Sequence, residues 1–380
     1  MIDALTNGLA QVSSPAYLLM LDGKDITENI APRLISLTIE DNRGFTADTL
    51  TLVLSDADGD IQLPQRDTKI RVFIGEKGYA LVGLGEFVID QVKHDGAPDK
   101  VTVIGRSADF NGKLNKEHEQ SWHDTTLGAI VEEIAKRCGL EASVAESLKR
   151  IKIAHIDQSM ESDASFLHRL AVRNGAELTV KWNKLMLIKP GRGLNAKGEA
   201  FPQVVIQRSD GDKHSFNIAD RSSYTGVTAR WLDTKKPKNQ TQKVQLQRKT
   251  TAQPPASTEH PQAVTPAAEQ SEKPVYVAGS ADNVYGMSTV YASKEEAKRA
   301  ADGLWHYIQR NTATFSLTLA RGRTDITPET PVRVSGFKTV IDDTAWTIKK
   351  VTHSLDNNGF VSKLDLEVKI EEGQYDVQNK

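Results

Sequence analysis

The feature that most constrains the fold of this chain is an internal repeat that links its two ends. Toward the N-terminus, the segment 70–72 (Ile-Arg-Val) leads through a glycine to the alternating segment 87–94, which opens with phenylalanine and closes with histidine. Toward the C-terminus, 332–334 (Val-Arg-Val) leads through a glycine to 346–353, which opens with tryptophan and also closes with histidine. An aliphatic segment follows each copy. Because this alternation is typical of β-strands, the sequence predicts a duplicated small β-domain.

Composition and charge narrow the class of protein. The 380 residues are 38% hydrophobic and 26% charged, with a net charge of −2, which argues against a chain built mainly to coat nucleic acid. Cys138 is the only cysteine, so no intrachain disulfide can form. The N-terminus lacks the pattern of a signal peptide, and the longest apolar run, 16–21, is too short to span a bilayer. We therefore expect synthesis in the cytoplasm and no stable membrane insertion.

The pattern along the chain predicts a mainly β fold with an α+β insert. Residues 1–110 contain six short segments rich in β-branched or aliphatic residues, separated by turn clusters, and we expect them to form a small β-barrel module. The six expected strands are 17–21, 34–39, 49–54, 70–74, 86–92 and 101–104.

Residues 111–199 are expected to form a compact α+β domain. Apolar residues recur at helical spacing from Leu127 to Cys138, with Asp124 or Thr125 as the N-cap. The other expected elements are a helix between Ser162 and Gly175 and two strands, 177–182 and 184–188.

The second β-module is predicted to be discontinuous, built from 200–232 and 313–372. Residues 233–290 are polar, proline-rich and basic in their first half, and we expect a mobile loop there, because such a segment buries little apolar surface. A capping box at 293–296 predicts a helix within 291–312. The seven strands expected in the second module are 203–206, 215–218, 226–231, 315–319, 332–334, 346–353 and 361–368.

No catalytic, cofactor-binding or metal-binding residue is predicted, so the protein is not expected to be an enzyme. The glycines at 83 and 85 precede a strand rather than a helix, so we interpret them as a turn and not as a phosphate site. The acidic loop 56–60 lacks the glycine and glutamate of a calcium loop and is interpreted as a solvated turn. His118 and His123 lack a visible third zinc ligand.

Three further residues were considered as functional candidates. Cys138 lies on the apolar side of its expected helix and is interpreted as a core residue. His94 and His353 occupy matched positions in the two copies of the repeat, and we expect backbone groups to satisfy both.

Several segments together resemble the late control protein D family of phages. The matching segments are 22–27 (DGKDIT), 41–48 (DNRGFTAD), 106–110 (RSADF), 121–127 (SWHDTTL), 155–163 (HIDQSMESD), 166–170, 224–231 and 346–353, continued by 359–360. The resemblance spans nearly the whole chain and fails only in the basic, proline-rich segment.

The resemblance implies a structural role at the centre of a contractile tail baseplate. It implies a homotrimer that joins the hexameric tail tube to a trimeric cell-puncturing spike and forms the channel for DNA ejection. Other baseplate proteins and the tape measure protein are further expected partners, whereas sequence-specific nucleic-acid binding is not expected. The protein would reside in the virion tail after assembly in the host cytoplasm, and two modules per chain would give a trimer six similar modules.

Three alternatives remain open at the level of sequence. A hub or spike subunit of a type VI secretion system would continue beyond the second module, whereas this sequence ends at Lys380, so we expect the spike to be a separate polypeptide. A contractile bacteriocin hub uses the same parts. A cell-wall hydrolase would have to place its activity in the α+β insert, where Glu117 and Glu119 are the residues to test.

Overall fold

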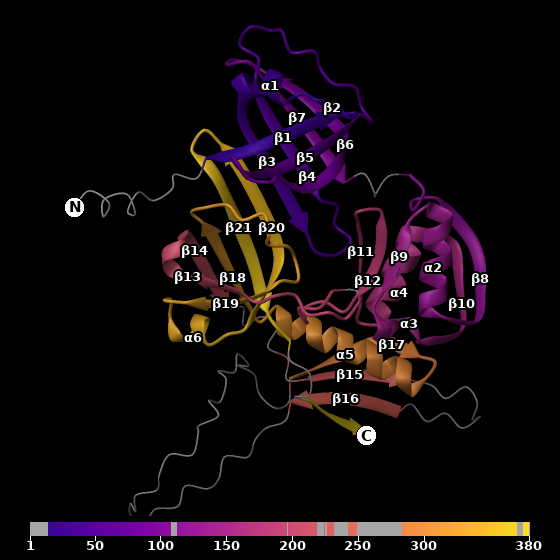
Figure 1. Cartoon of the computed structure of the whole chain (residues 1–380). Coiled ribbons are helices and arrows are strands. Elements are labelled where there is room, and N and C mark those ends of the chain that lie inside the picture. The colour runs from indigo at the N-terminus through magenta and orange to yellow at the C-terminus, as the bar shows by residue number, and fades with distance from the viewer. Residues whose placement is uncertain are drawn as a thin grey trace, which may run out of the picture.

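One 13-stranded sheet runs through most of the β-structure and joins the two ends of the chain (Figure 1). The computed structural model describes residues 14–107, 112–195, 197–218, 224, 226–231, 242–248, 283–370 and 375–379, with backbone only for 242–248 and 375–379. The strand order of the 13-stranded sheet is β14-β18-β21-β20-β3-β4-β7-β6-β5-β1-β2, and β13 and β19 pair beside this path.

The first β-module consists of the strands β1 to β7. Their inward faces alternate with outward ones, as in β4, where Leu50, Leu52 and Leu54 are buried and their neighbours are not. These side chains share one core with Leu19, and a short helix, α1 (Thr27–Ile30), follows β2. The strands are β1 (Pro15–Leu21), β2 (Lys24–Asp25), β3 (Leu34–Asn42), β4 (Thr49–Ser55), β5 (Lys69–Glu76), β6 (Val82–Asp95) and β7 (Lys100–Ser107). Each of the six expected strands lies within one of them.

The second β-module has a core of its own, in which Phe315 and Trp346 are the largest fully buried side chains. A short helix, α6 (Thr339–Asp342), closes one end, where the indole of Trp346 donates to the carbonyl of Ile341 at 3.0 Å. The strands are β13 (Val204–Gln207), β14 (Gly211–Ile218), β18 (Ala313–Leu319), β19 (Pro331–Ser335), β20 (Trp346–Asp356) and β21 (Gly359–Val368).

The two modules repeat the same strand order. The ladders run β1-β5-β6-β7-β4-β3 in the first module and β13-β19-β20-β21-β18-β14 in the second. The register also shifts at equivalent places in the two modules. Because β-bulges are specific features of a fold, their equivalent positions support the repeat. The shifts lie between Ile89 and Gln91 in β6, Ile348 and Lys350 in β20, Leu34 and Ser36 in β3, and Gly211 and Lys213 in β14. One difference is that β13 runs parallel to β19, whereas β1 and β5 are antiparallel.

A matched turn before β5 and β19 supports the repeat at the level of single hydrogen bonds. Asp67 and Glu329 both adopt a left-handed backbone, with φ of 65° and 71°. The N–H of Asp67 donates to the carbonyl of Ile89 at 3.0 Å, and that of Glu329 donates to the carbonyl of Ile348 at 2.8 Å. In each copy, the isoleucine N–H donates back at 3.0 Å to the threonine that follows the left-handed residue. The repeat read from the sequence is therefore present in the backbone, while closure of each module into a barrel stays a prediction.

The α+β insert packs two main helices against a three-stranded sheet and a two-stranded ribbon (Figure 1). The N-cap of α2 is Thr126, whose Oγ1 accepts from the N–H of Ala129 at 3.2 Å. The prediction of Asp124 or Thr125 was wrong, because both still belong to the strand that precedes the helix. The elements are β8 (Glu117–Thr126), α2 (Leu127–Cys138), β9 (Glu141–Val144), α3 (Glu146–Lys149), β10 (Lys152–Ser162), α4 (Asp163–Arg173), β11 (Glu177–Lys181) and β12 (Lys184–Ile188).

A separate four-stranded sheet carries the helix α5 (Lys294–Arg310) on one face. Ser293 is the N-cap as predicted, since its Oγ accepts from the N–H of Glu296 at 3.2 Å, but the Glu296 carboxylate accepts from the N–H of Ala292 and not from that of Ser293. Trp305 of this helix is fully buried. The strands are β15 (Gly226–Trp231), β16 (Gln242–Arg248), β17 (Val284–Tyr291) and β22 (Tyr375–Asn379).

This sheet corrects two expectations. The strand β15 was expected in the second module but pairs with β16 and β17 instead. The strand β16 and all but the last residue of β17 lie within 233–290, so the expectation of one mobile loop there is wrong. The alternation Gln-Lys-Val-Gln-Leu-Gln-Arg in β16 is a strand pattern that the polar composition concealed. Residues 233–241 and 249–282 of that segment lie outside the described residues. Within the described part of the chain, no helix has the length and apolar character needed to cross a membrane.

Candidate functional site: the junction of the two modules

The two β-modules are joined by a ladder between β3 and β20. Seven antiparallel pairs connect them, from Lys350↔Asn42 to Asp356↔Ser36. On one face of this ladder Ile39 and His353 are directly opposite each other and almost fully buried, at 1% and 2% exposure. The main-chain pairing makes one continuous sheet out of the two modules, so their relative orientation is fixed by hydrogen bonds and not left to a flexible linker.

The bulge in β20 lets this strand serve two partners on the same side. Before the bulge, the Trp346 end of β20 pairs with β19, and from Lys350 onward the strand pairs with β3. Because a bulge bends and twists a strand, the second half leaves its own module and turns toward the first. The salt bridge between Lys350 and Glu40, at 2.9 Å, lies on the solvent side of this ladder.

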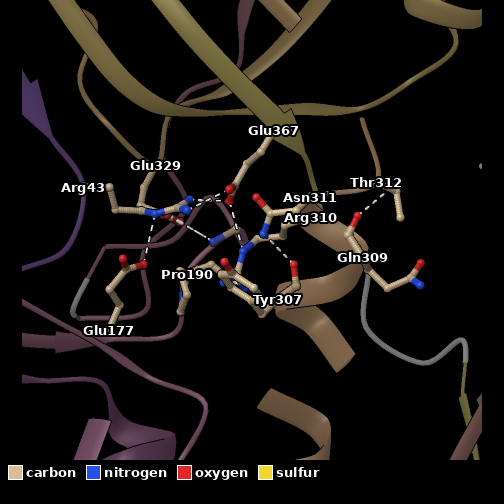
Figure 2. Close-up of polar contacts among 11 residues, drawn as sticks. Arg43, Glu177, Pro190, Tyr307, Gln309, Arg310, Asn311, Thr312, Glu329 and Glu367 are labelled. Carbon is tan, nitrogen blue, oxygen red and sulfur yellow. Dashed lines mark hydrogen bonds and ion pairs between the residues drawn. The ribbon is translucent and has the colours of Figure 1, made fainter. Parts of the chain in front are cut away.

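Arg43, the residue directly after β3, lies at the junction among three glutamates (Figure 2). Its side chain is only 5% exposed. Its guanidinium donates to Glu367 at 2.8 Å and to Glu329 at 3.0 Å, and its Nε lies 3.0 Å from Glu177 Oε2. The three carboxylates come from the end of β21, the turn before β19 and the start of β11. One arginine from the first module therefore holds both the second module and the α+β insert.

Arg310, at the C-terminal end of α5, completes the cluster (Figure 2). Its Nε lies 3.1 Å from Glu367 Oε1, and it donates to the carbonyl of Pro190 at 3.3 Å. The backbone N–H of Gly191 donates to both oxygens of Glu329, at 2.8 and 3.1 Å. Gly191 has a φ of +77°, and a Cβ there would lie 2.5 Å from Arg310 Cδ. Glycine is therefore required where the chain passes the cluster.

The cluster places two arginines against three glutamates, so its charge is not balanced. Burial, together with the neighbouring Glu367, raises the pKa of Glu329 to about 7 against the opposing effect of Arg43. Burial lowers the pKa of Arg310, although Glu367 opposes this. Burial alone would lower the pKa of Arg43, but its bonds to Glu367 and the other carboxylates raise it. Arg43 thus remains a fixed cation, and the pKa of Glu329 lies near neutral pH.

A second buried cluster ties the α+β insert to the first module. Lys181, at the end of β11, forms an ion pair with Asp41 in β3 and lies 3.3 Å from Asp48 Oδ2. Asp48 also accepts from the N–H of Asn42 at 2.8 Å. Burial raises the pKa of Asp48 to about 7, with Lys181 opposing and Asp41 adding to the rise. The insert is therefore held at two points, Glu177 and Lys181, on either end of one short strand.

The histidines matched by the repeat lie in different environments. His353 is buried, its Nδ1 lies 2.8 Å from Ser362 Oγ, and burial lowers its pKa to about 4. His94 has a side chain that is 45% exposed, and its Nε2 lies 3.3 Å from Asp56 Oδ2. The expectation that backbone groups satisfy both was wrong, because side chains do so in each case.

The other sequence candidates do not assemble into a site. Cys138 belongs to the core of the insert, where burial raises the pKa of its thiol. The Nε2 of His118 lies 3.7 Å from Asp163, while the ring of His123 stacks on that of His155. Among the residues that the structure describes, no group of three or more histidine, cysteine or acidic side chains is arranged to hold a metal ion.

The structure also tests the two turns expected at the glycines 83 and 85 and at the acidic loop 56–60. The glycines at 83 and 85 do not form a turn; they flank a register shift inside β6, where Leu84 is the extra residue. The acidic loop 56–60 is a turn, and within it Asp56 is buried and accepts from the N–H of Ile61 at 3.0 Å.

The residues of the junction were missed by the sequence reading because no spacing pattern connects them. Arg43, Glu177 and Glu367 are far apart in the chain, and each looks like an ordinary surface charge. The only available signal was indirect: Arg43 and Asp48 lie in one of the segments that resemble the late control protein D family.

Comparison with known proteins gives the family. The family model described as phage tail baseplate hub matches residues 85–359. The chain belongs to this family. It is 55% identical over 385 residues, and over the full length of both chains, to the "Probable baseplate hub protein" of Escherichia phage P2. Among solved structures, the 43 kDa tail protein of prophage MuSo2 from Shewanella oneidensis matches with a TM-score of 0.65 at 13% identity, over 93% of this chain and 98% of that one.

A similar fold is also found outside phages. The E. coli c3393 protein, a component of the type VI secretion system, matches with a TM-score of 0.51 at 11% identity, over 90% of this chain and 74% of that one. At this identity the likeness concerns the fold only.

Proposed function

We propose that this baseplate hub protein acts as a trimeric adaptor in a contractile tail, between the hexameric tail tube and the trimeric spike. The observation that carries the proposal is the repeat: each chain offers two modules with the same strand order and with two bulges at equivalent positions. Three chains then present six similar modules to a six-fold tube while remaining three-fold toward the spike. A ring of this kind encloses a passage through which DNA would leave the virion.

The junction supports a mechanical role. A ladder of seven residue pairs and the Arg43 cluster fix the relative orientation of the two modules within one chain. The spacing of the modules around a six-module ring depends on this orientation. A flexible junction would therefore prevent the ring from fitting the six-fold tube. The proposed role is therefore to transmit force and position rather than to catalyse a reaction.

The second candidate is a hub of a type VI secretion system or a contractile bacteriocin. The fold similarity to the E. coli secretion component favours it, but that similarity stands at 11% identity, against 55% identity over full length to the phage relative. A phage baseplate is accordingly the assembly we propose.

Light-scattering mass of the purified chain, alone and co-expressed with the spike, tests the proposal. We expect a mass near three times 41.8 kDa and a ring with six lobes in negative-stain averages. A chain that stays monomeric even with the spike present would overturn the trimeric adaptor.

A further inference from the structure

Among the open strand edges in the described part of the chain, two belong to the large sheet at places that the repeat relates to the junction. β14 pairs with β18 on one side only, and the second half of β6, from Gln91 to Asp95, pairs only with β7. Each edge presents a row of unpaired N–H and C=O groups, which is a template for another strand. Most side chains along these edges are exposed, including Lys93 and His94 in β6 and Asn217 and Ile218 in β14.

The repeat identifies the counterparts of these two edges, and in the structure those counterparts pair with each other. β14 corresponds to β3, and β6 corresponds to β20, because each pair occupies the same place in the strand order and carries its bulge at the same point. The ladder between β3 and β20 therefore shows the geometry in which a strand equivalent to β14 pairs with a strand equivalent to β6.

The matched side chains are more deeply buried in the β3–β20 ladder than at the open edges of β14 and β6. In the made joint, His353 and the opposing Ile39 are 2% and 1% exposed. At the open edges, His94 has a largely exposed side chain, and Phe216, the counterpart of Ile39, is only partly buried. The same two positions are therefore less buried at the open edges than in the made joint.

We infer that β14 of one copy adds antiparallel to the second half of β6 of another copy, in the register of the β3–β20 ladder. Carrying the pairs Thr352↔Glu40 and His353↔Ile39 over to the open edges gives Lys93↔Asn217 and His94↔Phe216 between copies. The same transfer sets Val92 opposite Ile218 and Asp95 opposite Ser215. This inference rests on the proposed function, since it names the surface through which the trimer forms.

The arrangement is head-to-tail, so it can close. Each chain has one open edge of either kind, on opposite modules, and a heterologous contact of this sort forms a ring when its rotation closes. Modules would then alternate around the ring, joined by covalent connection and ladder within a chain and by ladder alone between chains. Three chains give six equivalent joints and pair both of these edges in every chain.

Disulfide trapping tests the register directly. In the full-length chain, Lys93→Cys together with Asn217→Cys places two exposed positions opposite each other, within the Cα separation of about 4.4–6.8 Å that a disulfide spans. The native Cys138 is buried, so it contributes little background. After oxidation of the purified protein, we expect a gain of covalent trimer on non-reducing gels that reverts with reductant.

Two matched variants make the result specific. Lys93→Cys with Lys213→Cys moves one partner four residues along the same strand, about 13 Å away, and should not cross-link. Glu40→Cys with Thr352→Cys tests the same geometry within one chain and should form a disulfide without a gain in mass.

The outcomes separate this inference from the proposed function. A particle of trimeric mass in which Lys93→Cys and Asn217→Cys fail to cross-link, or cross-link no better than the off-register pair, overturns the register but leaves the trimer. Cross-linking of either cysteine to a co-expressed spike or tube protein in place of a second copy also overturns it. A chain that is monomeric in every preparation overturns both.

Discussion

Replacing Arg43 with methionine removes the cation that the three buried or half-buried glutamates of the junction share, while the apolar stem of the side chain is largely kept. Glu367 and Glu329 have side chains only 1% and 4% exposed, so water cannot take over the lost interactions. Breaking a buried ion pair by deleting one partner costs about 3–5 kcal/mol, because it leaves an uncompensated buried charge. We expect a loss of this size in the free energy of unfolding above pH 8.

The loss should shrink as the pH falls. Glu329 has a pKa of about 7 in the intact protein, and without Arg43 its pKa rises further, so below pH 6 its carboxyl is neutral. Glu367 keeps Arg310 as its partner, and Glu177, which also loses Arg43, is 31% exposed to water. The variant should therefore recover part of its stability on acidification.

Urea-induced unfolding followed by tryptophan fluorescence at pH 6 and pH 8 measures both effects. The matched control is Arg33→Met, which breaks the ion pair with Asp58, whose side chains are 27% and 49% exposed. An exposed pair of this kind contributes little to the free energy of unfolding, because water screens it. If Arg43→Met costs no more than this control, or costs the same at both pH values, the reasoning about the buried junction is wrong.

Three further predictions concern single buried groups. The folded-state pKa of Glu329 is raised, so its stabilising contribution is full below about pH 4 and is lost as the pH rises through about 7; Glu329→Gln should flatten that decline in urea midpoints. The folded-state pKa of His353 is lowered to about 4, so stability present above about pH 6.5 is lost as the pH falls through 4, and a glutamine there should weaken this acid dependence. Gly191→Ala should lower the melting temperature more than Gly198→Ala, because both have left-handed φ but only the first Cβ meets Arg310; equal effects would mean that the contact is relieved without cost.

The repeat could be predicted from the sequence because its signals are local. Alternation with a period of two fixes which side of each strand is buried, and the segments 70–72 and 332–334 begin their strands in the same way. The helix 127–138 was equally accessible, since its apolar stripe and terminal glycine are visible in one short window. Its N-cap was missed by one or two residues, because the strand before it continues up to Thr126.

The junction could not be predicted because it depends on which strands meet in space. Nothing local indicates that β3 would pair with β20, or that Arg43 would meet Glu367 more than three hundred residues later. The fate of Gly226–Trp231 shows the same limit, since its strand character was read correctly but its sheet was not. Pairing partners are chosen by the global packing of edges, which a single sequence does not display.

The two copies differ most where one joint is permanent and the other is open. Glu329 and Glu367 are buried anchors in the second module, while their counterparts by position, Asp67 and Arg106, are exposed in the first. Arg106 has a side chain that is 63% exposed and pairs with Asp90 at 2.8 Å. A joint made during folding can hold charges in a dry cluster, because they never need to return to water.

A joint made only on assembly has the opposite requirement. Before it forms, the edge must stay soluble and must resist pairing with a wrong strand, and exposed charges along it provide that protection. The histidine, lysine and acidic side chains along the second half of β6 meet this requirement, and β20, with the same backbone, does not need to. Exchanging the second half of β6 for that of β20 should therefore yield a chain that aggregates before it can assemble. A chimera that stays soluble and monodisperse would show that the charges on β6 serve some other purpose.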